Sequence, residues 1–331
     1  MPLKVLLIGL GRWGQVHLKT WKQLGADLLL CDASDALLEQ ARPSAKRVAK
    51  DYLELLDEAD VVDVVTPAPS HKAIVERCLE AGKDVHCEKP LTLASDESYA
   101  LAELAETRGR LLQVGHVFRF EPSVDAVREL IRSGKIGRPR SLAARFMGFK
   151  RPRNDGGVAV SDGIHFIDLC SYLLEKQPHK VNATLRDFLG RGMDDAAMIS
   201  LDYGREWATI EANYFTPEKK RDLVVMGESG AIVCDMLAKA AERVKVYAHA
   251  HAKKGAEWTA VEGPVTTIGV ADEEPLRREL ADFVRCHETR SRPSADGYAG
   301  AHAVAAIEAA ERSAREGRAV AVEIRHPAYA N

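Results

Sequence analysis

The sequence lacks the cysteine pattern of a disulfide-bonded or zinc-binding protein. Its six cysteines are scattered, and no two of them form a C-x-x-C pair. Such a pattern predicts neither a disulfide framework nor a structural zinc, and it fits a reducing compartment. Long apolar runs are also missing. The first run, Val5 to Ile8, is shorter than a signal-peptide core and is followed at once by Gly9 and Gly11. Because no stretch approaches the roughly 18 apolar residues of a membrane helix, we expect a cytoplasmic protein.

An excess of charge of either sign is missing as well. The 46 Lys and Arg residues nearly balance the 49 Asp and Glu residues, which leaves a net charge of −3. This balance provides no broad surface for nucleic acid or for anionic lipid, so any anion must bind at a local site. At 331 residues the chain exceeds one ordinary core, and we expect two domains.

Short apolar runs alternate with amphipathic segments in the first third of the chain. The runs are unbroken, as in strands buried on both faces, and they lie at 5–8, 28–30, 61–65, 85–87 and 111–114. The segments between them have helical spacing, and one of these helices begins at Ser70 and ends at Gly82. This alternation predicts a doubly wound parallel sheet of the Rossmann type over residues 1–119.

After about Phe120 the apolar pattern changes to a period of two. One helix at 122–133 precedes a series of alternating runs at 141–149, 181–185, 196–201, 207–214, 223–226, 232–234 and 244–247. Such runs predict a large, mostly antiparallel sheet. Two late helices follow at 275–288 and 299–315. We therefore predict an α/β protein in which an α+β domain, residues 120–331, follows the Rossmann domain.

A G-x-G-x-x-G motif lies between the first predicted strand and the first predicted helix, at Gly9, Gly11, Arg12, Trp13 and Gly14. The first glycine permits a tight turn, the second lets the backbone approach a pyrophosphate, and the third lets helix and strand pack closely. The free N–H groups of the helix N-terminus then favour phosphate. A glycine-rich turn without a ligand is the alternative. In this strand–helix context the motif predicts dinucleotide binding.

Asp32 ends the second predicted strand, 18 residues after Gly14. A carboxylate at this place accepts hydrogen bonds from the adenosine ribose hydroxyls and repels a 2′-phosphate. No arginine follows directly, since the next residues are Ala33 and Ser34. The position therefore favours NAD over NADP. The alternative is that Asp32 only caps the following turn.

Two further polar segments follow predicted strands. One reads T-P-A-P-S-H from Thr66 to His71, and the other reads C-E-K-P from Cys87 to Pro90. Open parallel sheets bind ligands at the carboxyl ends of their strands. We therefore predict cofactor contacts from Thr66, Pro67, His71 and Glu88, and we place Lys89 in the cleft. By itself, a lysine on a loop is more often a solvated charge.

Taken in order, these motifs resemble the Gfo/Idh/MocA family, the relatives of glucose–fructose oxidoreductase and inositol dehydrogenase. The resemblance continues in the segment from Asp162 to Leu169, D-G-I-H-F-I-D-L, which follows Gly156 and Gly157. It implies a Rossmann domain, a second domain with a broad antiparallel sheet, and a homodimer or homotetramer built through that sheet. It also implies NAD-linked oxidation of a carbohydrate or cyclitol hydroxyl, with Lys89 and His165 as the catalytic pair.

The proposed chemistry suits these two residue types. Oxidation of a secondary alcohol requires a base with a pKa near neutrality, and imidazole has one by default. A nearby ammonium stabilises the developing alkoxide. Many family members have an aspartate four residues before the histidine, where this chain has Ser161, and Asp162 lies one place later. Either Asp162 orients the His165 imidazole, or Lys89 takes more of the proton transfer.

A basic segment, Lys150-Arg151-Pro152-Arg153, precedes the Gly156 turn. It is either a solvated loop or a clamp for a substrate diphosphate, which guanidinium geometry suits. We predict a substrate site made of Arg119, Lys150, Arg151, Arg153 and Ser161. The segment Q-V-G-H-V-F-R-F, which contains Arg119, resembles the UDP-N-acetylhexosamine dehydrogenases of the family.

The resulting hypothesis is an NAD-dependent dehydrogenase of a nucleotide sugar, such as one that converts UDP-N-acetylglucosamine to its 3-keto form. A free sugar or inositol dehydrogenase is one alternative, and a non-catalytic NAD-binding regulator is another. We expect no nucleic-acid or membrane partner. No metal site is predicted, because His249 and His251 alternate in a segment that resembles an exposed hairpin and lack a third ligand.

Overall fold

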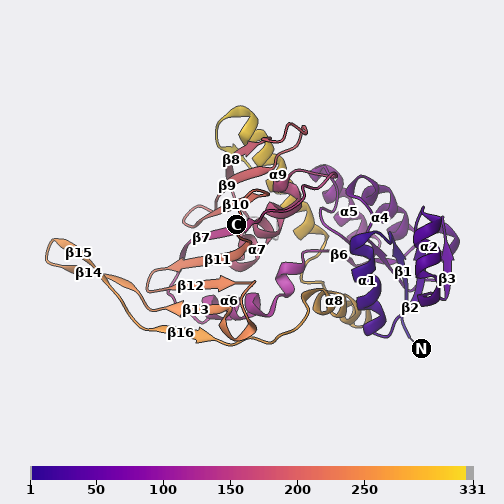
Figure 1. Ribbon diagram of the computed structural model, residues 1–331, viewed down its shortest axis with the longest axis horizontal. Coiled ribbons are helices and arrows are strands. Elements are labelled where there is room, and N and C mark those ends of the chain that lie inside the picture. Colours follow the sequence, from indigo (N-terminus) through magenta and orange to yellow (C-terminus); the bar gives the residue numbers. More distant parts are fainter. Residues whose placement is uncertain (1, 326–331) are drawn as a thin grey trace. The chain divides into compact units, whose positions relative to one another are not determined.

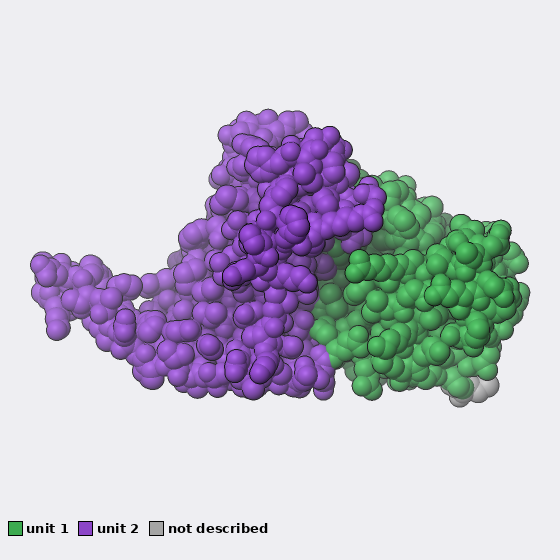
Figure 2. Space-filling view, in the orientation of Figure 1, with its two compact units in different colours: residues 1–117, 274–304 green, residues 118–273, 305–331 purple. Residues whose placement is uncertain are grey.

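The computed structural model describes residues 2–325, so the outer ends of both predicted domains, residue 1 and residues 326–331, lie outside the described residues. The chain forms two compact units (Figure 2). The first unit comprises residues 1–117 and 274–304, and the second comprises residues 118–273 and 305–331. The first of these boundaries lies close to the expected division at 119/120. The return of the chain to the first unit at residue 274 is not visible in the sequence.

A parallel sheet forms the centre of the first unit, as predicted (Figure 1), and it has six strands where the sequence predicted five. The strand order is β3-β2-β1-β4-β5-β6, and every neighbouring pair is parallel. The order reverses between β1 and β4, which is where open sheets of this kind bind ligands. The strands are β1 (Lys4–Ile8), β2 (Asp27–Cys31), β3 (Arg47–Ala49), β4 (Val61–Val64), β5 (Asp84–Cys87) and β6 (Leu112–Val114).

Helices cover both faces of this sheet, and alternate residues of β1 show how. Leu6 and Ile8 pack in the core on one face, where helices α3 (Leu53–Leu56), α4 (His71–Glu80) and α5 (Ser95–Thr107) bury their apolar sides. Val5 and Leu7 pack on the other face, under α1 (Arg12–Gln23), α2 (Asp35–Ala41) and α8 (Pro275–Thr289). The strands are therefore buried on both faces, which explains their unbroken apolar runs.

Helix α8 is the largest difference from the sequence-based division. We assigned it to the second domain, but its apolar side chains Leu276, Leu280 and Phe283 complete the core around Trp21 in the first unit. The helical spacing of these residues predicts that α8 buries one face, but it carries no information on which core receives that face.

A nine-stranded sheet forms the second unit, and its pairings confirm the prediction of a large, mostly antiparallel sheet. Only the β7–β10 pair is parallel among the described strands of this sheet. In spatial order the strands are β16 (Val265–Ile268), β13 (Val244–Tyr247), β12 (Ala231–Asp235), β11 (Lys220–Gly227), β7 (Pro139–Met147), β10 (Trp207–Asn213), β9 (Ala196–Asp202), β8 (Lys180–Arg186) and β17 (Val320–Ala321).

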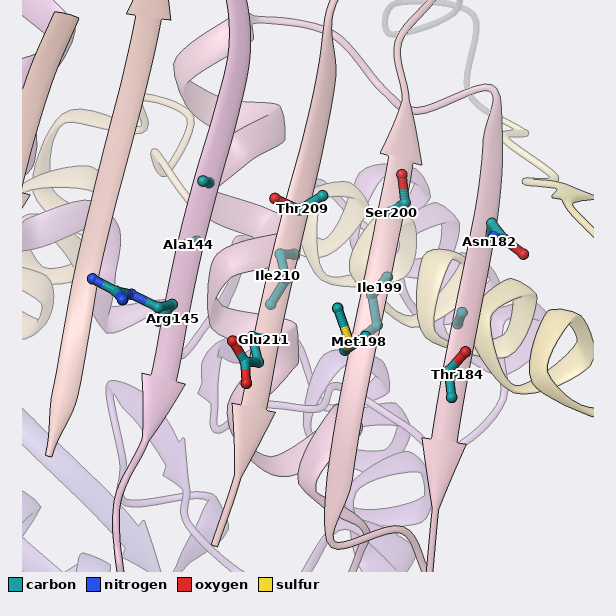
Figure 3. Close-up of a pocket in the computed structure, with 12 residues that line it drawn as sticks. Ala144, Arg145, Asn182, Thr184, Met198, Ile199, Ser200, Thr209, Ile210 and Glu211 are labelled. Atoms are coloured by element: carbon teal, nitrogen blue, oxygen red, sulfur yellow. The ribbon is translucent and has the colours of Figure 1, made fainter. Parts of the chain in front are cut away.

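Among the described residues, the helices of this unit pack on one face of the sheet. On β10, Ala208, Ile210 and Ala212 are buried, whereas Trp207 on the other face is 50% exposed. Helices α6 (Pro122–Arg132) and α7 (Ile164–Leu174) pack on the buried face. Figure 3 shows the opposite face, which carries a pocket lined by residues such as Met198 and Glu211.

A hairpin of β14 (Ala250–Lys254) and β15 (Glu257–Val261) pairs apart from the large sheet (Figure 1). His249 and His251 lie at this hairpin and are both exposed. The last described helix, α9 (Gly297–Glu316), follows α8. Among the described helices, none combines the length and apolarity that a membrane crossing requires.

Candidate active site

The glycine motif forms the turn between β1 and α1, and each glycine has the environment that its predicted role requires. Gly9 has a φ of +98°, and a Cβ there would lie 2.7 Å from the carbonyl oxygen of Val65. A Cβ on Gly14 would collide with the carbonyl oxygen of Gly9. A Cβ on Gly11 would meet nothing within 4 Å, so this glycine borders open space at the start of α1. The residues present therefore fit a pyrophosphate that approaches the backbone at Gly11.

Asp32 follows β2 and braces the same turn. Its Oδ2 accepts a hydrogen bond from the backbone N–H of Leu10 at 2.7 Å, and its Oδ1 accepts one from Ser34 at 2.8 Å. The carboxylate thus makes the turn contact that the structural alternative predicts, and it also holds the glycine turn in place. Its recognition of a ribose stays a prediction.

His71, at the start of α4, connects the two polar segments. Its Nδ1 lies 2.9 Å from the carbonyl oxygen of Pro90, and its Nε2 lies 2.7 Å from that of Thr66. The ring is almost fully buried. This position makes His71 a brace between the T-P-x-x-S-H and E-K-P turns. The predicted cofactor contacts of His71, Thr66 and Pro67 remain untested.

Glu88 joins the E-K-P turn to the first helix. Its Oε1 accepts a hydrogen bond from the indole N–H of Trp13 at 2.7 Å and lies 3.3 Å from Nε2 of His17. Its Oε2 accepts one from the backbone N–H of Lys89 at 3.1 Å. A Cβ on Gly115 would lie 2.8 Å from Oε1, so that glycine leaves room for the carboxylate. Glu88 therefore links the turn that contains Lys89 to helix α1, which begins in the glycine motif.

Behind Glu88 lies a fully buried cluster centred on Asp63 of β4. Its Oδ2 contacts Nδ1 of His17 at 2.8 Å and accepts the indole N–H of Trp21 at 2.6 Å, and its Oδ1 lies 2.8 Å from Nδ1 of His86. His17, Asp63 and His86 offer the donor types of a metal site. Because both imidazoles and an indole already hydrogen-bond to the one carboxylate, hydrogen bonding accounts for the arrangement.

The ionisation of this cluster follows from its contacts. Burial alone would lower the pKa of His17, but Asp63 and Glu88 outweigh it and raise that pKa to about 10. Burial alone would raise the pKa of Glu88, but His17 lowers it to about 2. The pKa of Asp63 is likewise lowered by His17 and His86 against the effect of burial. The ionised side chains of Asp63, His17 and Glu88 therefore form a row of negative, positive and negative charge from β4 to the E-K-P turn.

Sequence reasoning missed this cluster, although one signal was present. Asp63 interrupts the otherwise apolar run V-V-D-V-V of a strand that we expected to be buried. A carboxylate in such a strand needs hydrogen-bonding partners. Its partners His17 and Trp21 lie 46 and 42 residues away along the chain.

In the second unit, His165 lies on α7 within a group of aromatic rings. Its imidazole stacks on Phe118 with centroids 4.6 Å apart and planes at 17°, and Phe146 and Phe166 complete the group. The ring is 9% exposed. A π-helical turn, Ala159–Gly163, precedes α7. This turn carries Ser161, whose Oγ hydrogen-bonds to the carbonyl oxygen of Gly157 at 2.7 Å and to Oη of Tyr214 at 2.8 Å.

Most of the cations that we predicted to bind substrate form ion pairs with carboxylates of the protein. Lys150 donates to Oδ2 of Asp162 at 2.6 Å, and Arg153 forms two hydrogen bonds with Asp155. Arg151 is exposed. The structure thus brings Asp162 to Lys150, and its predicted action on His165 remains a hypothesis.

Arg119 is the most deeply buried of these cations. Its Nε donates to Oδ2 of Asp168 at 2.8 Å, its Nη2 donates to Oδ1, and its guanidinium lies over the ring of Tyr172. Such a bidentate buried pair is a structural role for Arg119, whereas contact with a substrate stays a prediction. Lys89 belongs to the first unit and His165 to the second.

Sequence comparisons match both parts of the chain. The model of an oxidoreductase family with an NAD-binding Rossmann fold, GFO/IDH/MocA, matches residues 3–116, and that of the GFO/IDH/MocA C-terminal domain matches residues 124–233. D-apiose dehydrogenase of Paraburkholderia graminis is 27% identical in an alignment that covers 96% of this chain and 89% of that protein. Inositol 2-dehydrogenase of Rhizobium meliloti is 25% identical over 97% of this chain and 100% of that protein.

Structural comparisons support the same fold. UDP-N-acetylglucosamine 3-dehydrogenase of Acidithiobacillus ferrooxidans superposes with a TM-score of 0.83, with 23% identity and coverage of 96% of this chain and 99% of that chain. A levoglucosan dehydrogenase in complex with NADH and levoglucosan superposes with a TM-score of 0.85, with 21% identity and coverage of 98% and 100%. At these identities the likeness shows the shared fold.

Proposed function

The chain belongs to the GFO/IDH/MocA family and is an NAD-dependent dehydrogenase of the sugar and inositol type, and from that premise we propose that it oxidises a secondary hydroxyl of a nucleotide sugar. A UDP-N-acetylglucosamine 3-dehydrogenase is 33% identical over 54% of this chain, which supports that substrate class. Free sugars and inositols, which the names of other relatives specify, are the alternative substrates.

The fixed position of the E-K-P turn carries the proposal. Glu88 ties Lys89 to the helix that begins in the glycine motif, so the lysine and the cofactor turn belong to one rigid frame. In the proposed reaction His165 removes the hydroxyl proton, and the Lys89 ammonium stabilises the alkoxide that forms. When bound, NAD supplies the hydride acceptor. The backbone around Gly11 would hold its pyrophosphate, and Asp32 its adenosine ribose.

A substrate panel tests the proposal. Nucleotide sugars, free sugars and inositols are each offered with NAD or NADP, and formation of the reduced nicotinamide is followed by absorbance. We expect a higher kcat/KM for a nucleotide sugar than for its free sugar, and a preference for NAD that Asp32→Ala relaxes. A preference for an uncharged polyol would refute the nucleotide-sugar assignment and leave the dehydrogenase intact.

We propose further that the protein is a homodimer or homotetramer in the cytoplasm. The open face of the nine-stranded sheet exposes 64% of Met198, 50% of Trp207 and 36% of Met226, which makes it a candidate interface. Figure 3 shows Met198 on this face. All six cysteines are free and buried, as suits a reducing compartment. Light scattering measures the assembly, and Met198→Glu should shift it to smaller species if this face is the interface.

A further inference from the structure

Arg221 is a cation of the second unit that neither the motifs nor the family resemblance singles out. It lies on β11 opposite Phe146 of β7. Its guanidinium carbon is 4.5 Å from the centre of the Phe146 ring and 5.7 Å from that of Phe118. The side chain is half-buried, and its Nε is buried with no hydrogen-bond partner among the described residues.

The acids around Arg221 are engaged with other cations. Asp162 pairs with Lys150 at 2.6 Å, and Glu121 lies 3.8 Å from Arg243. Both carboxylates act on Arg221 from a distance, and neither lies within ion-pair range of it among the described residues. Burial lowers the pKa of Arg221, and these two acids only partly oppose that effect. The surroundings therefore withdraw water from the guanidinium without supplying a matching anion.

One aromatic ring lies next to both Arg221 and the proposed base. Phe118 stacks on the His165 imidazole at 4.6 Å and also faces the Arg221 guanidinium. Phe146 likewise lies near both groups, 6.1 Å from the His165 ring and 4.5 Å from the guanidinium carbon. His165 and Arg221 therefore border the same two rings, which is the arrangement that a substrate in contact with both would need. A guanidinium group that stacks on aromatic rings can still donate hydrogen bonds from its N–H edge to planar or tetrahedral oxyanions.

We propose that Arg221 binds an oxyanion of the substrate, either a phosphate or a carboxylate, next to the carbon that is oxidised. The inference rests on the proposed dehydrogenase function of this site. Under this proposal Arg221 binds the anion in place of the segment 150–153. In that segment Lys150 and Arg153 already pair with carboxylates of the protein. The proposal also predicts that the substrate is an acidic sugar derivative and not a neutral polyol.

Matched substrate pairs test this assignment and identify the source of the anion. The pairs are UDP-N-acetylglucosamine with N-acetylglucosamine, glucose 6-phosphate with glucose, and glucuronate with glucose. Wild-type enzyme should prefer the anionic member of at least one pair, and that pair identifies the anion as diphosphate, monophosphate or carboxylate. In Arg221→Met the KM for that anionic member should rise by about 10- to 1,000-fold, as expected when a charge-assisted bidentate contact is lost. The neutral member should be affected much less.

Two further variants make the result specific. Arg221→Lys keeps the charge but loses the two-pronged geometry, so its KM should lie between those of wild type and Arg221→Met. Lys220→Met is the matched control, because it removes a cation from the neighbouring position of β11 that is paired with Glu218 on the surface, and its KM should not change. NAD affinity should stay constant in all three variants, since Arg221 and Lys220 lie outside the first unit.

Several outcomes would overturn the assignment. An equal loss of kcat/KM on the anionic and neutral members of every pair would show that Arg221 only supports the fold. A wild-type preference for neutral sugars would also refute it, while the dehydrogenase function stands. If no sugar is oxidised, the proposed function fails. The thermal shift produced by UDP-N-acetylglucosamine, glucose 6-phosphate or glucuronate then decides, since Arg221→Lys must reduce it if the oxyanion binds there.

Discussion

Asp63 in the first unit is surrounded by three hydrogen-bond donors, whereas Arg221 in the second unit is surrounded by aromatic rings. Both groups have lost water to burial, but only Asp63 is fully matched by protein partners. The matched cluster can hold the E-K-P turn in one position whether or not a ligand is present. The unmatched cation gains its partner when a ligand arrives. The cofactor side of the enzyme is thus preorganised by its own charges, and the substrate side keeps one charge for recognition.

The largest effect should come from the two residues that we propose as the catalytic pair, one in each unit. Lys89→Ala and His165→Ala should each lower kcat by about two to four powers of ten, given the usual contribution of acid–base groups. NAD affinity should remain close to wild type, which fluorescence titration of NADH measures. Wild-type turnover in both variants would show that the catalytic pair is misassigned and would favour a non-catalytic NAD-binding role.

Removal of the central charge breaks the matched cluster. Asp63→Asn leaves the His17 imidazolium with one fewer carboxylate in a fully buried site, and it should destabilise the protein by about 3–5 kcal/mol. Asp162→Asn is the control, because its partner Lys150 is partly exposed, and the expected cost is about 1 kcal/mol or less. Denaturant unfolding measures both. Equal costs would contradict the contrast between the two regions.

The same cluster should make stability depend on alkaline pH. The folded-state pKa of His17, about 10, exceeds its ordinary value of 6.5. The contribution of the His17 charge to the free energy of unfolding is therefore fully present below pH 6.5 and is lost as the pH rises toward 10. The difference in melting temperature between wild type and His17→Gln should shrink across this range. His251→Gln, on the exposed hairpin, should show no such trend, and a constant difference for His17→Gln would refute the ionised form.

The smallest effect should come from the basic segment 150–153. Arg153 is already engaged by Asp155, so Arg151→Ala combined with Arg153→Ala should raise the KM for an anionic substrate by less than about tenfold, the equivalent of one weak charge contact. Arg221→Met in parallel should give the larger change. A reversed order would return anion recognition to the segment and remove the special status of Arg221.

Local patterns were sufficient for much of the fold. The unbroken runs around Val5 and Val61 and the alternating residues around Ala208 predicted the two sheets, because burial on two faces or on one face leaves a direct trace in the sequence. The short strand β3 was not predicted, since its segment Arg47–Ala49 has too few residues for a period to show. The parallel β7–β10 pair was missed because period-two patterns carry no information on strand direction.

In the candidate site, too, local motifs could be predicted and contacts between distant segments could not. Gly9, Gly11 and Gly14 are close in sequence and have a fixed spacing, so the motif could be found and its geometry matches the expected roles. The partners of Asp63 and the rings around Arg221 come from distant segments, and only the folded chain brings them together. The pairing of Arg119 with Asp168 was likewise not predictable, because an isolated arginine gives no sign of the distant acid that it will contact.

The return of α8 to the first unit determines how this enzyme can be divided. A fragment that ends near residue 119 would lack Leu276, Leu280 and Phe283, and so would expose the apolar surface around Val5 and Trp21 to water. Such a fragment is a poor candidate for independent folding, in spite of its complete dinucleotide motif. Exchange of cofactor modules between related enzymes would therefore have to move two separate stretches of the gene together. The cofactor-binding unit is therefore discontinuous in the sequence.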